Sequence, residues 1–247
     1  MTADPRILSW ATTHVGAKRS HNEDMLVNRP DLGVWAVADG AGGHDAGEVA
    51  SGMIAAALEA IPPGLPPGDL LSLVRARVAD VHTQLREEAA RRGPDVIIAS
   101  TVVILVARDD HFACLWAGDS RAYLLRDGTL LQISHDHSLV QELVDTGAID
   151  AAAAEHHPHA NVITRAVGAA LDELALDKVS DRLQPGDRFL LCSDGLSKTL
   201  EEADMRGLLA GPLDPSPTEA MIAAALARQV NDNVTAVVVA FDAKRGA

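Results

Sequence analysis

The stretch Gly33-Val34-Trp35-Ala36-Val37-Ala38-Asp39-Gly40 joins an apolar run to an aspartate and a glycine. Residues 34–38 are predicted to form a strand, because a short continuous apolar run is typical of a buried one. A strand end is a rigid place for a short carboxylate, and the glycine lets the backbone turn sharply, so that its carbonyl can also face an ion. The stretch therefore predicts a strand that presents Asp39 at its end.

Four further aspartates stand in comparable contexts at widely separated positions, and four of the resulting five abut apolar, strand-like runs. The five are Asp24, Asp39, Asp119, Asp194 and Asp232. Hard divalent cations such as Mg²⁺ and Mn²⁺ prefer oxygen ligands, whereas zinc or copper would favour clusters of His or Cys. Acids that converge without cations would repel one another. The pattern indicates one metal site assembled from distant segments.

Any one of these acids, taken alone, has a simpler interpretation. Asp-Gly is a common turn dipeptide, so a single aspartate of this kind is more readily a turn residue than a ligand. Asp127-Gly128, which lies between two apolar runs, is interpreted in this way as the turn of a hairpin.

Hydrophobic periodicity predicts an α+β fold with two sheets packed face to face and helices outside. Strands are predicted at about 7–13, 26–28, 34–38, 100–107, 111–117, 121–126, 129–133, 176–183, 187–192 and 234–241. Helices are predicted at about 46–60, 69–92, 201–209 and 218–229. The prolines and glycines of 62–68 are interpreted as a tight helix-to-helix turn rather than a linker, so a single domain covering 1–247 is expected.

The motifs that carry the aspartates resemble those of the metal-dependent serine/threonine protein phosphatases, also called protein phosphatase 2C or PPM phosphatases. They are Arg-x-x-Asn-Glu-Asp at 19–24, Val-Ala-Asp-Gly at 37–40 with Gly-Gly-His at 42–44, Gly-Asp-Ser-Arg at 118–121, Ser-Asp-Gly at 193–195 and Asp-Asn-x-Thr at 232–235. Residues 136–140 and 161–168 are similar to the stand-alone bacterial branch. The resemblance runs from about 13 to 241. It implies the family's αββα sandwich of two mainly antiparallel sheets, with a flap subdomain at about 135–168.

The resemblance also implies a ligand set for two Mn²⁺ or Mg²⁺ ions. Asp39 would bridge the two ions, the carbonyl of Gly40 would bind one of them, and Asp194 and Asp232 would bind the other. In bacterial relatives, the acid that corresponds to Asp119 can join Asp194 around a third, weaker ion. A buried hydrogen-bonding role of Asp119 with its neighbours Ser120 and Arg121 is the alternative.

Three residues are expected to support this centre. The resemblance implies that Glu23 and Asp24 hold metal-bound waters and that Arg19 clamps the substrate phosphate. A guanidinium suits that task because it stays charged and can donate two parallel hydrogen bonds to phosphate oxygens. The alternative for Arg19 is a surface or salt-bridged arginine. Asn233 is expected either to orient the ligand loop or to cap and stabilise its turn.

The proton donor for the leaving group is an open question. Some relatives, chiefly eukaryotic, place a His directly after the metal-binding Asp-Gly, and many bacterial ones place a Met, but this chain has Ala41. Water or His44 would then donate the proton, although His44 is as readily a structural residue at a helix start. The histidines at 135, 137, 156, 157 and 159 are interpreted as solvated loop residues, because no spacing among them defines a zinc site.

Composition and charge argue against some classes of binding partner. A formal net charge of −14 argues against nucleic acid or an anionic membrane as the main partner. Cys114 and Cys192 lie in apolar runs, so they are interpreted as buried small hydrophobes, which suits a reducing cytoplasm. No signal peptide precedes the first strand and no apolar stretch is long enough to cross a bilayer. A soluble, monomeric, cytoplasmic protein is expected.

The activity that the resemblance implies is the hydrolysis of phosphoserine and phosphothreonine in proteins, by a dinuclear Mn/Mg centre with a metal-activated water. The partners would be phosphorylated proteins and a cognate bacterial Ser/Thr kinase, in a secretion or envelope pathway. Two alternatives are a non-catalytic regulator that binds phosphoproteins and a metallohydrolase of small phosphate esters. The intact ligand set favours an enzyme, but selectivity among phosphate esters depends on surface loops.

Overall fold

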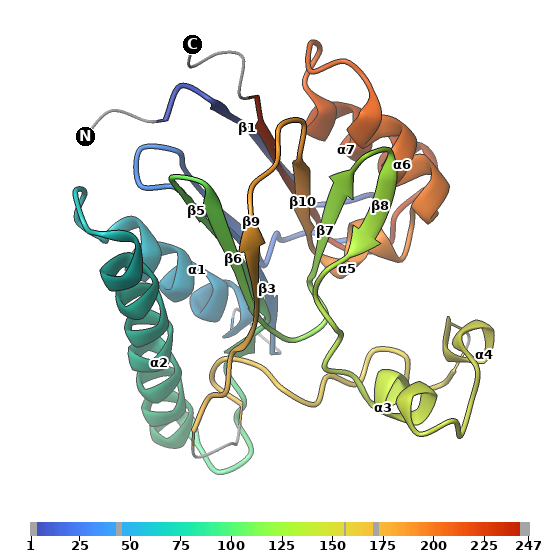
Figure 1. Cartoon of the computed structure of the whole chain (residues 1–247). Coiled ribbons are helices and arrows are strands. Elements are labelled where there is room, and N and C mark those ends of the chain that lie inside the picture. The colour runs from blue at the N-terminus through green and yellow to red at the C-terminus, as the bar shows by residue number, and fades with distance from the viewer. Residues whose placement is uncertain (1–3, 43–45, 156, 170–172, 243–247) are drawn as a thin grey trace.

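The computed structural model describes residues 4–42, 46–155, 157–169 and 173–242, in which two β-sheets face each other (Figure 1). The strands are β1 (Ile7–His14), β2 (Asp24–Arg29), β3 (Val34–Ala41), β4 (Ala99–Ser100), β5 (Val102–Arg108), β6 (His111–Ala117), β7 (Arg121–Arg126), β8 (Thr129–Gln132), β9 (Asp177–Arg182), β10 (Arg188–Cys192) and β11 (Val234–Phe241). The helices are α1 (Ala46–Glu59), α2 (Pro67–Arg92), α3 (Leu139–Asp145), α4 (Ala151–Glu155), α5 (Asp194–Ser197), α6 (Glu202–Ala210) and α7 (Pro217–Ala227).

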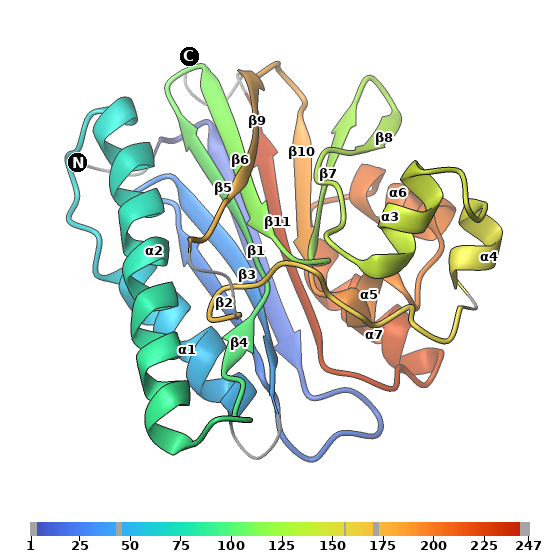
Figure 2. The same cartoon turned by 90° about the horizontal axis from the view of Figure 1, so that it is seen from below.

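Both sheets are antiparallel. One has the strand order β1-β11-β10-β7-β8, and the other has the order β2-β3-β5-β6-β9, with β4 paired to β3. In Figures 1 and 2, α1 and α2 cover the outer face of the second sheet, and α5, α6 and α7 cover the outer face of the first. The expected αββα sandwich is confirmed.

Three apolar layers hold the sandwich together, because each buried strand offers side chains to both of its faces. In β3, Val34, Ala36 and Ala38 pack against α1 and α2, whereas Trp35 and Val37 point into the layer between the sheets. The third layer lies between the first sheet and α6 and α7. The two cysteines are free and buried, as expected. Asp39 follows Val37 by two residues and therefore projects towards the layer between the sheets.

The predicted elements agree closely with the observed ones, and the differences have local causes. The α2 helix begins at Pro67 rather than at residue 69, because proline is tolerated in a first helical turn, where its missing N–H has no partner to lose. The hairpin at Asp127-Gly128 is confirmed, with φ of 51° and 76° at its two central residues, as a tight two-residue turn requires. Helices α3, α4 and α5 were not predicted, since they are too short to show a period.

The segment 135–168 leaves the sandwich after β8 and returns before β9 (Figure 1). Its base is closed by backbone hydrogen bonds from Leu139 to Val162 (2.9 Å) and from Thr164 to His137 (2.9 Å). Ser138 caps α3 by accepting from the backbone N–H of Gln141. Among the residues that the structure describes, no helix combines the length and the apolar character needed to span a bilayer.

Candidate metal centre

The five aspartates predicted from the sequence converge at one end of the layer between the sheets. Asp24 begins β2 and lies opposite Asp39 of β3 in the antiparallel ladder. Although Asp39 keeps some contact with solvent, burial raises its pKa well above the ordinary value. The nearby carboxylates of Asp24, Asp194, Asp119 and Asp232 raise this pKa further, because each disfavours a second negative charge.

Asp24 connects the two sheets. Its Oδ2 accepts hydrogen bonds from Ser193 Oγ (2.8 Å) and Thr235 Oγ1 (2.7 Å), which lie at the end of β10 and in β11. Burial raises the pKa of Asp24 to about 7 against the opposing effect of these two hydrogen bonds. Its Oδ1 is buried and has no hydrogen-bond partner. Burying a carboxylate oxygen without a hydrogen-bond donor costs free energy. A bound ligand or water at Asp24 Oδ1 would offset that cost.

Gly195 allows the segments that carry Asp194 and Asp232 to meet. Asp194 is the first residue of α5, directly after β10, and Asp232 precedes β11. A Cβ placed on Gly195 would lie 1.9 Å from the carbonyl oxygen of Asn233, so only glycine fits there. The glycine of the Ser-Asp-Gly motif therefore sets the distance between two candidate ligands.

Asn233 fastens the loop that carries Arg19 and Glu23. Its Oδ1 accepts from the backbone N–H of Glu23 (2.8 Å), and its Nδ2 donates to the carbonyls of Val15 and His21 (2.9 Å each). The turn itself is stabilised by Asp232, whose Oδ1 accepts from the backbone N–H of Asn233 (2.9 Å). Of the two expected roles for Asn233, orientation of the loop is the one that its contacts fit.

The start of α1 packs on the backbone of Gly40. A Cβ on Gly40 would lie 2.2 Å from the carbonyl oxygen of Gly47, and a Cβ on Gly47 would lie 2.8 Å from the carbonyl oxygen of Gly40. Ser51 Oγ donates to the carbonyl of Glu23 (2.6 Å), and the N–H of Gly40 donates to the same oxygen (3.2 Å). Gly47 and Ser51 thus support the site, and sequence reasoning missed both because they lie within an ordinary Ala-rich helix. His44, the candidate proton donor, lies outside the described residues.

Arg19 forms an ion pair with a candidate ligand. Its Nη2 lies 2.8 Å from Asp232 Oδ2, and both side chains are well exposed. The alternative of a salt-bridged arginine therefore describes this conformation. Because the partner is Asp232, the guanidinium nevertheless lies at the edge of the carboxylate cluster.

Asp119 does not have one of the two roles considered for it. Ser120 Oγ bonds to Thr101 Oγ1 (2.7 Å), and the guanidinium of Arg121 pairs with Asp136 (2.7 Å), so the alternative in which Asp119 hydrogen-bonds with Ser120 and Arg121 is wrong. Asp119 Oδ2 instead faces Lys198 Nζ at 3.4 Å, and Asp119 Oδ1 is buried without a partner. Burial, with a smaller effect from Asp194, raises the pKa of Asp119 to about 6.

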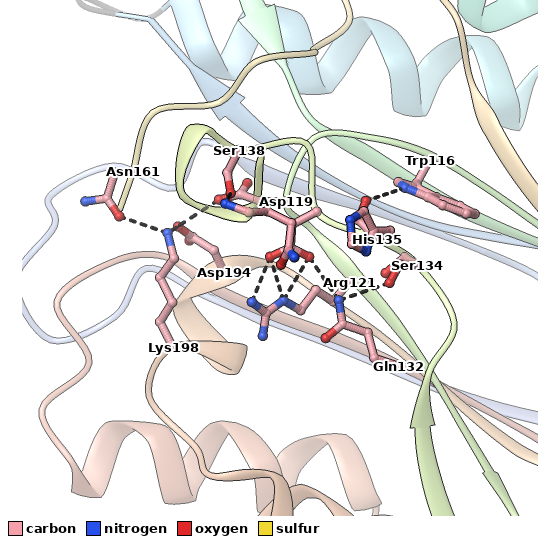
Figure 3. A network of polar contacts seen from close by, with 12 residues as sticks. Trp116, Asp119, Arg121, Gln132, Ser134, His135, Ser138, Asn161, Asp194 and Lys198 are labelled. Atoms are coloured by element: carbon pink, nitrogen blue, oxygen red, sulfur yellow. Dashed lines mark hydrogen bonds and ion pairs between the residues drawn. The ribbon is translucent and has the colours of Figure 1, made fainter. Parts of the chain in front are cut away.

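Lys198 lies at the centre of a polar network that the sequence did not reveal. Figure 3 shows its ammonium directed towards Asp119, Asp194 and Asn161. The Nζ atom lies 2.7 Å from Asp194 Oδ2 and 2.9 Å from Asn161 Oδ1. Burial alone would lower the pKa of Lys198, but the two carboxylates outweigh it and raise this pKa.

One of the loop histidines is not solvated. His137 is buried; its Nδ1 accepts from the N–H of Gly118 (3.1 Å), so that its Nε2 carries the proton and faces Asp177 Oδ2 (3.2 Å). Its interpretation as a solvated loop residue was therefore wrong. His135 is exposed and pairs with Asp145 (2.7 Å), and His156 lies outside the described residues.

The carboxylates that meet here fit hard divalent cations, which prefer oxygen ligands. Two of their oxygens, Asp24 Oδ1 and Asp119 Oδ1, are buried without a hydrogen-bond partner. In the described part of the chain, no three His, Cys, Asp or Glu side chains already form a cage around one point. Ion pairs explain why no such cage is formed: Arg19 pairs with Asp232, and Lys198 pairs with Asp194 and Asp119. Metal binding would require Asp232 at least to exchange its cationic partner.

Comparison with known proteins identifies relatives of the same architecture. The structure of PppA, described as a key regulatory component of T6SS in Pseudomonas aeruginosa, is 43% identical with a TM-score of 0.87 and covers 95% of this chain and 98% of that one. The catalytic domain of serine/threonine protein phosphatase PstP, in complex with two manganese ions, is 34% identical with a TM-score of 0.79, covering 95% and 97%.

Curated sequences agree with the structures. Serine/threonine protein phosphatase PstP of Mycobacterium tuberculosis is 38% identical over 90% of this chain, which spans only 43% of that protein's length. Serine/threonine phosphatase stp of Listeria welshimeri is 32% identical over 92% of this chain and 93% of its own. The family model described as protein phosphatase 2C matches residues 13–232. Together with the two antiparallel sheets and their converging aspartates, these matches show that the chain belongs to the protein phosphatase 2C family.

Proposed function

We propose that this protein hydrolyses phosphoserine and phosphothreonine in other proteins with the help of two Mn²⁺ or Mg²⁺ ions. The observation that carries the proposal is the convergence of Asp24, Asp39, Asp194 and Asp232 from both sheets, close enough for the other carboxylates to raise the pKa of Asp39. The structure of the PstP catalytic domain with two manganese ions supports the same reading.

The ion-binding residues of this proposal are those that the family resemblance implies. Asp39, the carbonyl of Gly40, Asp194 and Asp232 would hold the two ions. When bound, the ions would neutralise phosphoryl oxygens and lower the pKa of a water molecule.

Asp24 and Glu23 would act on water rather than on the ions. Ser193 and Thr235 hold Asp24 Oδ2, so that Oδ1 is the oxygen left without a hydrogen-bond partner and free to accept from a water molecule. Asn233 and Ser51 bind the backbone of Glu23 from two sides. These fixed contacts keep both acids in place without a cost of reorganisation during the reaction.

Arg19 would bind the substrate phosphate. Its present partner, Asp232, is also a candidate ligand, so an ion that takes Asp232 would leave the guanidinium available for the phosphate. Ala41 ends β3 and cannot donate a proton, so the serine or threonine alkoxide would take its proton from water or from His44.

The finer expectations are part of the same proposal. Its substrates would be the targets of a bacterial Ser/Thr kinase in the cytoplasm, and the protein would act as a monomer with residues 135–168 as a flap beside the site. The similarity to PppA makes proteins of a secretion system the first substrates to try.

The test is phosphate release from a phosphothreonine peptide by protein stripped of metal and then resupplied with Mn²⁺ or Mg²⁺. Release only with metal supports the proposal, and equal rates without metal refute it. Small phosphate esters, assayed in parallel, separate a protein phosphatase from a general metallohydrolase. Metal binding without turnover of any ester would favour a regulator that binds phosphoproteins.

A further inference from the structure

Lys198 joins three segments of the chain through one ammonium group. It follows α5 directly and lies four residues after Asp194, a spacing that often gives an ordinary surface ion pair. Here the same Nζ atom also reaches Asp119, in the connection between β6 and β7, and Asn161, in the segment 135–168 (Figure 3). Contacts to three separate segments distinguish it from a solvated lysine.

Asp119 needs a positive charge. Its side chain is 5% exposed, its Oδ2 lies 3.4 Å from Lys198 Nζ, and the same Nζ lies 2.7 Å from Asp194 Oδ2. Arg121, its neighbour in the chain, is committed to Asp136 by three hydrogen bonds of 2.7 to 3.0 Å. Lys198 is therefore the cationic side chain that faces both Asp119 and Asp194.

We propose that the ammonium of Lys198 takes the place of a cation between Asp119 and Asp194, so that this pair of carboxylates does not take up a divalent ion. The inference rests on the proposed function, because it concerns which carboxylates the metal ions use. A divalent ion would need oxygens of the same two side chains at about 2.1 Å, next to a fixed positive charge that repels it. The two ions held by Asp39, the carbonyl of Gly40, Asp194 and Asp232 are then the ones that bind.

The same ammonium positions the segment 135–168. It donates to Asn161 Oδ1 at 2.9 Å, and the backbone contacts between Leu139 and Val162 carry that anchor to α3. A divalent ion bound by Asp119 and Asp194 would push Lys198 away and release Asn161. Lys198 thus connects Asp194 to Asn161 through a covalently attached charge, which, unlike a bound metal ion, cannot dissociate.

The experiment counts ions directly. Metal-free protein is titrated with Mn²⁺ by isothermal titration calorimetry, and bound manganese is measured after desalting. We expect Lys198→Ala to bind about one Mn²⁺ per chain more than the wild type, and we expect the double variant Lys198→Ala/Asp119→Asn to lose this additional ion. Lys198→Arg keeps the charge and should bind as many ions as the wild type. Lys178→Ala, which removes an exposed lysine of β9, is the matched control and should bind the wild-type number.

A Lys198→Ala variant that binds the wild-type number of ions overturns the inference, and so does an additional ion that survives Asp119→Asn. Limited proteolysis of metal-free protein gives a second readout: Lys198→Ala and Asn161→Ala should both speed cleavage within 139–163, and no change in either variant would refute the positioning role.

Failure of the inference and failure of the proposed function are distinguishable, because the titration requires no turnover. If the protein is an active phosphatase and Lys198→Ala binds as many ions as the wild type, only the inference is refuted. A protein that gains the additional ion in Lys198→Ala but hydrolyses no phosphopeptide refutes only the proposed function. Absence of Mn²⁺ binding in every variant refutes both.

Discussion

Asp24 and Asp39 lie directly opposite each other in the ladder between β2 and β3. Directly opposed residues of an antiparallel pair project from the same face, and like charges at such positions destabilise the sheet. Both side chains face the layer between the sheets, where Trp35 and Val37 are fully buried. The fold therefore carries an electrostatic cost at this point, and a divalent cation is the ligand that would relieve it.

Removal of one charge at this centre should separate activity from stability. We expect Asp39→Asn and Asp194→Asn to abolish phosphopeptide turnover, because an amide is a poor ligand for a hard cation. Asp39→Asn should also raise the stability of the metal-free protein by roughly 1 kcal/mol, since it removes repulsion with Asp24. Turnover and thermal unfolding in EDTA measure the two effects. Near wild-type turnover in either variant would contradict the ligand assignment.

The metal-free protein should lose stability as the pH rises. Burial raises the pKa of Asp24 to about 7 and that of Asp119 to about 6, whereas both groups titrate near pH 4 in an unfolded chain. Between these values the folded state retains protons that the unfolded state has released, so stability falls through this window and levels off above it.

We therefore expect the unfolding temperature in EDTA to fall between about pH 4 and about pH 7. The stabilisation by Mn²⁺ should grow over the same range, because the ions relieve a repulsion among the carboxylates that increases as they lose protons. Asp24→Asn should flatten the fall. Thermal unfolding at several pH values, with EDTA or with Mn²⁺, is the measurement, and a metal-free protein that becomes more stable over this range would disprove the electrostatic account.

The sequence predicted those parts of the fold that are local. Apolar runs that end in Asp-Gly or Gly-Asp defined β3, β6 and β10, and a long amphipathic period defined α2. The prediction failed for α5, which has only four residues, because so short a helix has neither a period nor a cap to show. Its position matters nonetheless, since it aims Asp194 at the site.

Contacts between distant segments were the part of the site that no local pattern contained. Lys198 and Asp119 are 79 residues apart, and Ser193 and Asp24 are 169 residues apart. Each of these side chains has an ordinary neighbourhood in the sequence. His137 is a second example. It was wrongly predicted to be solvated, because the groups that contact it, the N–H of Gly118 and the ring of Trp116, come from the end of a different strand.

Loss of the Arg19 guanidinium should weaken substrate binding more than it slows the chemical step. A phosphate clamp acts before the transition state, so we expect Arg19→Ala to raise KM roughly 10- to 100-fold with a smaller change in kcat. The KM of Arg19→Lys should lie between those of the wild type and Arg19→Ala, since lysine keeps the charge but cannot donate two parallel hydrogen bonds. Arg91→Ala on α2, whose partner Glu88 lies on the same helix, is the matched control. Steady-state kinetics on a phosphothreonine peptide would reject the clamp if KM stayed unchanged.

Asn233 should be more important for the site than its size suggests. Replacement by alanine removes three hydrogen bonds, to the N–H of Glu23 and to the carbonyls of Val15 and His21. We expect Asn233→Ala to lower the free energy of unfolding by about 3 kcal/mol, which corresponds to a fall of roughly 6–12 °C in Tm. Because the freed loop carries Arg19 and Glu23, kcat/KM should fall even at temperatures where the variant is folded. Asn231→Ala, an exposed neighbour, should change neither quantity. A variant at 233 with full kcat/KM would show that the loop keeps its place without this side chain.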